Sequence, residues 1–187
     1  MRKIEQDLIE WLDKKLAGNG LAKLALETKD ARLLFGLAAE ACVGIVEKGG
    51  NNDGPLVRLL QDTLGKPERE PWCMSFVQSC LAYAEKKTGV ISPIFASEHC
   101  QTVWNKTPEV QRVKTSPLKY AIVVWRYEGT SSGHTGIVLE CDYRQWFRSV
   151  EGNTNGDGSR DGDGVYYKRR DWIRNGSLVK MGFLKPF

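Results

Sequence analysis

The hydrophobic period of this chain changes once, near residue 115, and that change limits the folds open to it. Before this point apolar residues recur at helical spacing, one face at a time. After it come short segments rich in β-branched and aromatic residues, bounded by Gly, Ser, Asn or Asp, which are typical of strands. A series of helices followed by a series of antiparallel strands is typical of an α+β fold. We therefore expect N-terminal helices packed on an antiparallel sheet of about five strands.

These patterns give the expected helices and strands. Each helical stripe ends at glycine, which breaks or caps helices. The expected helices cover residues 4–16, residues from about Thr28 to the Gly49-Gly50 pair, residues 56–64 and residues 73–88. The expected strands are Tyr120–Tyr127, Thr135–Leu139, Trp146–Val150, Val165–Tyr167 and Leu178–Leu184.

Length and charge limit the number of domains that the chain can form and the partners that it is expected to bind. At 187 residues and 41% hydrophobic content it can fill one ordinary core but not two. We expect residues 1–28 to form an N-terminal helical extension and residues 29–187 to form one domain. The formal charge is +4 without a long block of like charge, which favours a solvated basic surface and no nucleic-acid partner.

Export and membrane signals are not evident in the sequence. There is no run of about 18 apolar residues, so no membrane insertion is expected. The first residues mix charged with apolar side chains instead of forming the apolar centre of a signal peptide. We therefore expect synthesis in the cytoplasm without a classical signal peptide, so that another agent delivers the protein to any substrate outside.

The cysteines provide a candidate nucleophile. There are five, an odd number, and no two form a Cys-x-x-Cys pair, which predicts reduced thiols instead of a disulfide framework or a zinc site. Most free cysteines are small core residues. Cys73 alone is expected at a helix N-terminus, where unpaired N–H groups favour the thiolate.

The chain has two histidines, so the choice of a base is narrow. His134 opens an expected strand after a Ser/Gly turn and can reach a cleft, whereas His99 adjoins Cys100, and adjacent side chains point in different directions. Glu151 closes the next strand and could accept the ring N–H of His134, and Asn153 has the same reach. A thiol, a base and an acidic or amide orienting group form the minimum set for nucleophilic attack on an amide.

One further run has the alternation of a calcium loop. It consists of Asp157, Ser159, Asp161 and Asp163, but Lys168 stands where an EF-hand needs its bidentate glutamate. We interpret the run as a polar turn. We expect no metal site and no cofactor.

Several blocks of the sequence resemble those of a known enzyme family. The blocks are Pro71–Val77, Gly133–Val138 and Val150–Thr154, together with the preceding run Glu47–Asn52. They are similar to the signature blocks of the CHAP family, amidases and peptidases of the papain-like NlpC/P60 group that cut peptidoglycan. The resemblance covers about residues 30–187 and implies a papain-like NlpC/P60 (CHAP) fold, with residues 29–187 as a CHAP-like catalytic domain.

The resemblance also implies roles for single residues. Cys73 would be the nucleophile, His134 the base, and Glu151 or Asn153 the orienting residue. The substrate bond would be either the one between muramic acid and L-alanine, as for an amidase, or one within the peptides, as for an endopeptidase.

Substrate contacts are implied for Trp72 and Asn52. Many CHAP domains place Gln before the catalytic cysteine, whereas this chain has Trp72, so the backbone N–H of Cys73 is the expected oxyanion donor. The implied setting is a phage endolysin that lyses the cell, or an injected effector with an immunity protein as partner. Two other functions stay open, a non-catalytic cell-wall binding module and an intracellular papain-like protease acting on proteins.

Overall fold

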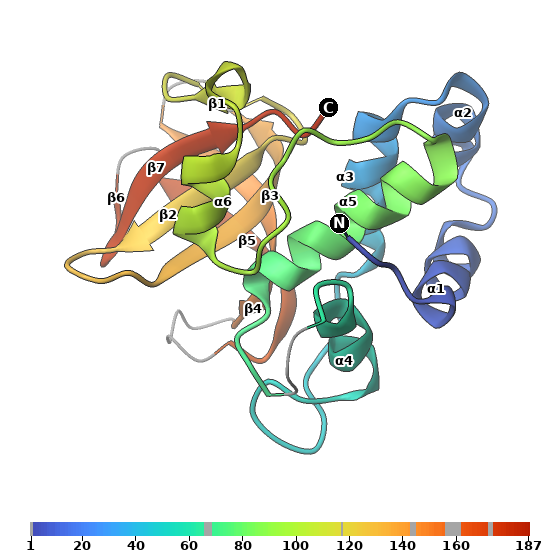
Figure 1. Cartoon of the computed structure of the whole chain (residues 1–187), viewed down its shortest axis with the longest axis horizontal. Helices are drawn as coiled ribbons and strands as arrows, with labels where there is room; N and C mark the ends of the chain where they lie inside the picture. Colours follow the sequence, from blue (N-terminus) through green and yellow to red (C-terminus); the bar gives the residue numbers. More distant parts are fainter. Residues whose placement is uncertain (1, 66–68, 117, 143–144, 156–161, 172–173) are drawn as a thin grey trace.

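Figure 1 shows the computed structural model of the chain, which describes residues 2–65, 69–116, 118–142, 145–155, 162–171 and 174–187. The helices are α1 (Gln6–Leu16), α2 (Gly20–Thr28), α3 (Ala31–Ala41), α4 (Pro55–Asp62), α5 (Cys73–Thr88), α6 (Cys100–Lys106) and the short 3-10 helix η1 (Glu109–Gln111). The strands are β1 (Arg112–Val113), β2 (Ile122–Tyr127), β3 (Gly133–Cys141), β4 (Trp146–Thr154), β5 (Gly164–Asp171), β6 (Arg174–Asn175) and β7 (Leu178–Leu184).

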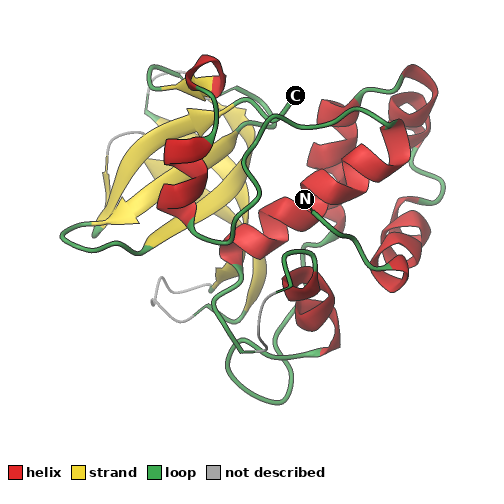
Figure 2. Cartoon of the chain, in the orientation of Figure 1, coloured by secondary structure: helices red, strands yellow, loops and turns green. Residues whose placement is uncertain are grey.

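The strands form one antiparallel sheet in the order β1-β7-β2-β3-β4-β5, with β6 paired to β7. Figure 2 shows most of the helices gathered on one side of the molecule and the sheet on the other. α5 joins the two layers because it contacts β3 and β4 as well as α3. The α+β prediction, with helices packed on an antiparallel sheet, is confirmed.

Helix α5 is the central element of the core. It begins at Cys73 and ends before Gly89, whose φ of +77° lies in the left-handed region that favours glycine. Its side chains are buried over most of its length. A Cβ on Gly152 of β4 would lie 2.8 Å from the Cβ of Phe76, so this glycine is what allows α5 to approach the sheet closely.

The α-helices α2 and α6 and the 3-10 helix η1 were not expected from the sequence, and one expected helix is longer than the helix that forms. The Gly18-Asn19-Gly20 segment ends α1 and also leads into α2. The Asn19 side chain caps α2 by accepting hydrogen bonds from the backbone N–H groups of Leu21 and Ala22 at 3.0 and 3.1 Å. The helix expected from about Thr28 to Gly49 does form, but it covers only Ala31–Ala41. α3 ends at Ala41, and Gly44 turns the chain at φ +91° so that Val46 can pair with Gly164.

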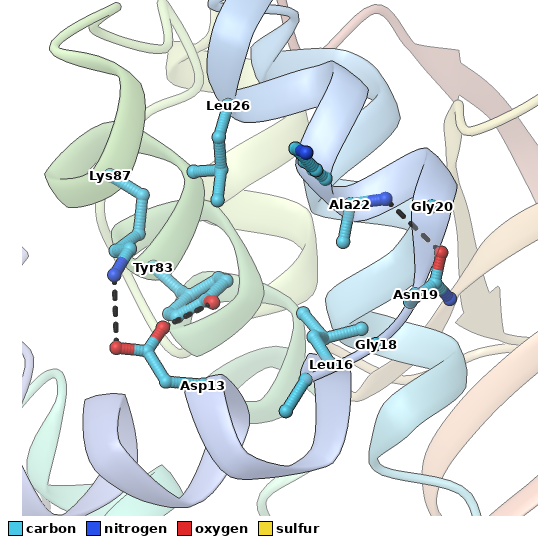
Figure 3. Close-up of a pocket in the computed structure, with 11 residues that line it drawn as sticks. Asp13, Leu16, Gly18, Asn19, Gly20, Ala22, Leu26, Tyr83 and Lys87 are labelled. Carbon is cyan, nitrogen blue, oxygen red and sulfur yellow. Dashed lines mark hydrogen bonds and ion pairs between the residues drawn. The ribbon is translucent and has the colours of Figure 1, made fainter.

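The N-terminal helices share the core of the rest of the chain. Leu8 and Leu12 are buried among residues of α3 and α5. Asp13 of α1 accepts a hydrogen bond from the Tyr83 hydroxyl at 2.7 Å and from Lys87 at 2.9 Å, as Figure 3 shows. The separation of residues 1–28 from residues 29–187 stays a prediction.

A pocket of about 350 Å³ lies where α1, α2 and α5 meet (Figure 3). Its apolar lining includes Leu16, Ala22 and Leu26. The described residues that line it include no thiol and no imidazole. Among the residues that the structure describes, no helix is long and apolar enough to cross a membrane.

Candidate active site

The predicted nucleophile, base and orienting residue meet at one end of α5. Cys73 is the first residue of α5, His134 lies near the start of β3, and Glu151 lies on β4, the neighbour of β3 in the sheet. A cavity of about 550 Å³ opens beside them, and its lining includes Cys73 and His134. The fold therefore brings together three side chains that are up to 78 positions apart in the sequence.

Cys73 combines burial with an unusual electrostatic setting. Only 8% of its surface is exposed, and its Sγ lies 4.0 Å from the Sγ of Cys100. Contact with the Cys100 thiol, a hydrogen bond with His134 and the N–H of Met74 together lower the pKa of Cys73 well below its usual range, although burial acts in the opposite direction. The free N–H groups at the start of α5 also favour negative charge. Cys73 is therefore placed to act as a thiolate.

His134 is held between Glu151 and the thiol. Its Nε2 lies 2.8 Å from Oε2 of Glu151, which leaves Nδ1 as the ring nitrogen for Cys73. The imidazole also stacks on Trp125, with ring centroids 5.8 Å apart. Burial alone would lower the pKa of His134, but its hydrogen bonds with Cys73 and Glu151 raise it to about 9. The two pKa shifts have opposite signs, and together they favour a thiolate at Cys73 and an imidazolium at His134.

Glu151 is fully buried, and every oxygen of its carboxylate is occupied. Oε1 accepts hydrogen bonds from the Ser149 hydroxyl at 2.6 Å and from Nε of Arg170 at 2.8 Å, and Oε2 accepts one from Nη2 of Arg170 as well as facing His134. Burial would raise the pKa of Glu151, but Arg170 and His134 lower it to about 2. The carboxylate therefore stays charged and fixes the imidazole ring.

Arg170 is a residue of the candidate site that the sequence did not reveal. The overall charge pattern favours a solvated basic surface, yet the side chain of Arg170 is only 15% exposed. Its guanidinium lies over the ring of Trp125, 5.4 Å from the centroid. The signal that could have found it is physical, because a carboxylate buried beside a histidine needs a second cation, and the basic residues of the following strand are the nearest source.

Asn153 does not contact the imidazole. Its backbone φ is +51°, and its Nδ2 donates to Oδ1 of Asn52 at 2.6 Å and to Oε1 of Glu47 at 3.4 Å. Of the two candidates for the orienting residue, the geometry therefore favours Glu151. Asn52 and Asn153 both line the cavity beside Cys73, so their amides are within reach of a ligand there.

Trp72 is fully buried, and its indole N–H donates to Oε1 of Glu47 at 2.9 Å. The structure does not support a direct substrate contact for its side chain. Instead Glu47, a second residue that sequence reasoning missed, ties Trp72 to the loop of Asn52 by also accepting the Asn52 N–H at 2.8 Å. This network fixes the wall of the cavity next to the nucleophile.

Two glycines of the Gly133–Val138 block make room for the site. A Cβ on Gly136 would lie 2.5 Å from Cγ of Glu151, and one on Gly133 would lie 2.8 Å from Cβ of Cys100 and 2.5 Å from the carbonyl oxygen of Trp125. Neither glycine has a positive φ. Space, not backbone conformation, is therefore what requires glycine at these positions.

Gly136→Ala will displace Glu151, because the new methyl group overlaps its side chain in a packed interior. We expect the rate of a reaction catalysed at this site to fall by at least about tenfold, since a small displacement of a catalytic group has large effects on rate. The measurement is the initial rate together with a thermal melt. Gly20→Ala is the control, because nothing lies within 4 Å of a Cβ there, and equal losses in both variants would contradict the steric account.

The calcium-like run falls largely outside the described residues. Asp157, Ser159 and Asp161 are not described, and the carbonyl oxygen of Asp163 accepts the N–H of Glu47 at 2.8 Å. Within the described part of the chain, no three potential ligands among His, Cys, Asp and Glu gather in a group that could hold a metal ion.

Comparison with curated proteins and with solved structures gave no match. A family model does match, over residues 65–153, and its description is the CHAP domain. This range includes the N-terminus of α5, all of β3 and most of β4, and so contains Cys73, His134 and Glu151. The likeness read from the three sequence blocks is thereby confirmed, because residues 65–153 of this chain match the CHAP domain.

Proposed function

We propose that this protein is a cysteine hydrolase that cleaves an amide bond in the peptide part of bacterial peptidoglycan. CHAP domains are generally hydrolases that act on peptidoglycan, which supplies the substrate class. The observation that carries the proposal is the continuous contact from Cys73 through His134 to the buried Glu151, beside an open cavity.

The first step is attack by the Cys73 thiolate on the carbonyl carbon of the amide. Negative charge then develops on the carbonyl oxygen. The N–H of Met74 bonds to the Cys73 sulfur, so the backbone N–H of Cys73, at the positive end of α5, is the donor best placed to stabilise this oxyanion.

His134 carries the proton through both halves of the reaction. As an imidazolium it protonates the leaving amine, which breaks the C–N bond and leaves a thioester on Cys73. The neutral ring then accepts a proton from water, which attacks the thioester and releases the acid product. Glu151 keeps the ring oriented and stabilises its positive charge in each cycle.

The cavities suit an extended peptide better than a compact ligand. The cavity beside Cys73 adjoins a second one of about 370 Å³, and the two share Tyr127, His134 and Asn153 in their linings. A substrate can therefore extend on both sides of the bond that is cut. Both an amidase acting at the muramic acid to L-alanine bond and an endopeptidase acting within the peptides satisfy this geometry.

The biological role we propose is cell lysis. In that role the protein acts on the cell wall after release from the cell that makes it, as an endolysin does. If it is instead injected into another cell, the producing cell needs an immunity protein that blocks the cavity beside Cys73.

The test is digestion of purified peptidoglycan, with mass spectrometry of the soluble fragments and Cys73→Ala as the matched inactive variant. We expect fragments only from the unaltered protein, and their new termini identify the bond. A free L-alanine amine indicates an amidase, and new ends within the peptides indicate an endopeptidase. If peptidoglycan is untouched while casein is cut, the protein protease replaces this proposal, and if neither is cut, the binding module does.

The charged pair also sets the expected pH dependence. The active form has Cys73 deprotonated, with a pKa well below the usual thiol range, and His134 protonated, with a pKa raised to about 9. We expect a bell-shaped kcat/KM with its alkaline limb near pH 9. A rate that keeps rising through pH 9, as for a thiol that must first lose its proton, would contradict the pair.

The ionisation of His134 and Glu151 also sets how the stability of the fold depends on pH. His134 has a raised pKa, so its contribution is complete below the pKa of the unfolded chain and is lost as pH rises through about 9. Glu151 has a lowered pKa, so its contribution is present above the ordinary carboxyl range and is lost as pH falls toward 2. Thermal melts across this range measure both effects.

A further inference from the structure

We propose that Cys73 and Cys100 are a peroxide-sensitive pair that closes to a disulfide, which switches the hydrolase off reversibly and protects its nucleophile. The switching of activity rests on the proposed function, because it assumes that Cys73 is the nucleophile. The formation of the bond between the two sulfurs does not depend on that assumption.

The geometry of the two thiols is the first observation. Their sulfurs are 4.0 Å apart although the residues are 27 positions apart in the chain. Each is the first residue of its helix, Cys73 of α5 and Cys100 of α6. A disulfide has an S–S distance of about 2.05 Å, so the sulfurs must approach by roughly 2 Å, which side-chain rotation and a small shift at the start of α6 can supply.

The position of Cys100 is fixed by its packing against Gly133 of the sheet. Its Cβ occupies the space that a side chain at position 133 would need, because a Cβ on Gly133 would lie only 2.8 Å from it. Both thiols are nearly buried, yet both line the cavity beside His134, so a small oxidant that enters the cavity meets them together. A reactive thiolate next to a second thiol is the arrangement that favours disulfide formation over further oxidation.

The chemistry balances with a hydroperoxide as the oxidant. The Cys73 thiolate attacks one oxygen of hydrogen peroxide, the O–O bond breaks, and Cys73 sulfenic acid forms, while the departing hydroxide takes the proton held by the His134 imidazolium to give water. The Cys100 sulfur then attacks the sulfenic sulfur, the S–O bond breaks, and the departing hydroxide takes the Cys100 proton to give water. Two thiols and one peroxide thus become one disulfide and two waters. A dithiol reverses the change by supplying two electrons and two protons.

The chain contains a second thiol contact that serves as an internal comparison. Cys42 of the segment after α3 and Cys80 of α5 contact each other, and both are fully buried in the core. Burial and the Cys42 contact raise the pKa of Cys80 well above its usual range, so it stays a protonated, inert thiol. Both pairs are in side-chain contact, so what distinguishes Cys73 and Cys100 is the cavity that they line and the thiolate character of Cys73.

The experiment treats the reduced protein with a few equivalents of hydrogen peroxide, removes the excess with catalase, and divides the sample into portions with and without dithiothreitol. We expect the thiol count of the denatured protein to fall from five to three, and non-reducing peptide mapping to find Cys73 joined to Cys100. Hydrolysis should fall at least about tenfold and return to within about twofold of the untreated rate after dithiothreitol.

The key variant is Cys100→Ser, with each protein compared with its own untreated rate. Without the second thiol, Cys73 should proceed to sulfinic acid, so dithiothreitol should restore less than about a tenth of its rate. Cys141→Ser, which removes a thiol at the end of β3, should respond as the unaltered protein does.

The proposal is overturned if the oxidised protein contains no Cys73–Cys100 peptide, if Cys42 and Cys80 join first, or if Cys100→Ser recovers as fully as the unaltered protein. If no hydrolysis is found at the start, the proposed function fails, but the peptide map still decides whether the disulfide forms.

Discussion

Cys73→Ala will leave a folded protein whose hydrolysis of peptidoglycan is lower by roughly 10³-fold or more, because the reaction loses its nucleophile while binding is kept. Folding should survive because the lost sulfur borders a cavity at the first residue of α5, not the centre of the core. The measurement is the rate of fragment release, combined with a thermal melt.

Cys80→Ala is the matched control, because it makes the same change on the same helix. Cys80 is fully buried in the core, so its truncation should cost about 1 kcal/mol of stability through lost packing and leave the rate close to normal. The two variants should therefore show opposite patterns, one losing activity and the other stability. A Cys73→Ala protein that keeps more than about a tenth of the rate would contradict the assignment of the nucleophile.

Glu151→Ala is expected to cause the largest combined loss. The substitution removes the group that orients His134, and it leaves Arg170 largely buried without its carboxylate partner. Removing one partner of a buried ion pair costs about 3–5 kcal/mol. We therefore expect a large drop in the free energy of unfolding, measured by denaturant titration, and a fall in rate of at least about 10²-fold.

A second substitution separates the two effects. In the double variant Glu151→Ala with Arg170→Met the unpaired charge is gone, so part of the lost stability should return. The rate should not return, because His134 still lacks its orienting carboxylate. A double variant no more stable than Glu151→Ala would contradict a buried ion pair, and a double variant with normal rate would contradict the orienting role.

Much of the architecture could be predicted from local patterns. The β-branched segments after residue 115 correspond to β2, β3, β4, β5 and β7, and the apolar spacing after Cys73 with Gly89 as its stop corresponds to α5. These signals work because one face of each element is buried, which imposes its period on the sequence. The position of Cys73 at a helix N-terminus was predicted on that ground, and the structure confirms it.

The contacts between distant segments could not be predicted in the same way. In the β4–β5 pairing Arg170 lies opposite Phe147 and Glu151 lies opposite Tyr166, so the Arg170 side chain reaches along the sheet to Glu151, a contact that no local sequence pattern predicts. Only Cys73 was expected at a helix N-terminus, yet Cys100 is the first residue of α6, whose seven residues are too few to display a helical period in the sequence. The Glu47 carboxylate accepts hydrogen bonds from Trp72, Asn52 and Asn153, and these contacts are visible only in the folded chain.

The most direct test of the Cys73 and His134 pair is the rate of alkylation of Cys73 by iodoacetamide as a function of pH, with hydrolysis of peptidoglycan measured in the same samples. A thiolate held by an imidazolium predicts modification that stays fast well below the usual thiol pKa, falls only in acid, and removes hydrolysis in proportion to the Cys73 peptide modified. Alkylation that follows the titration of an ordinary thiol near pH 8.5, or hydrolysis that survives complete modification of Cys73, would contradict the account.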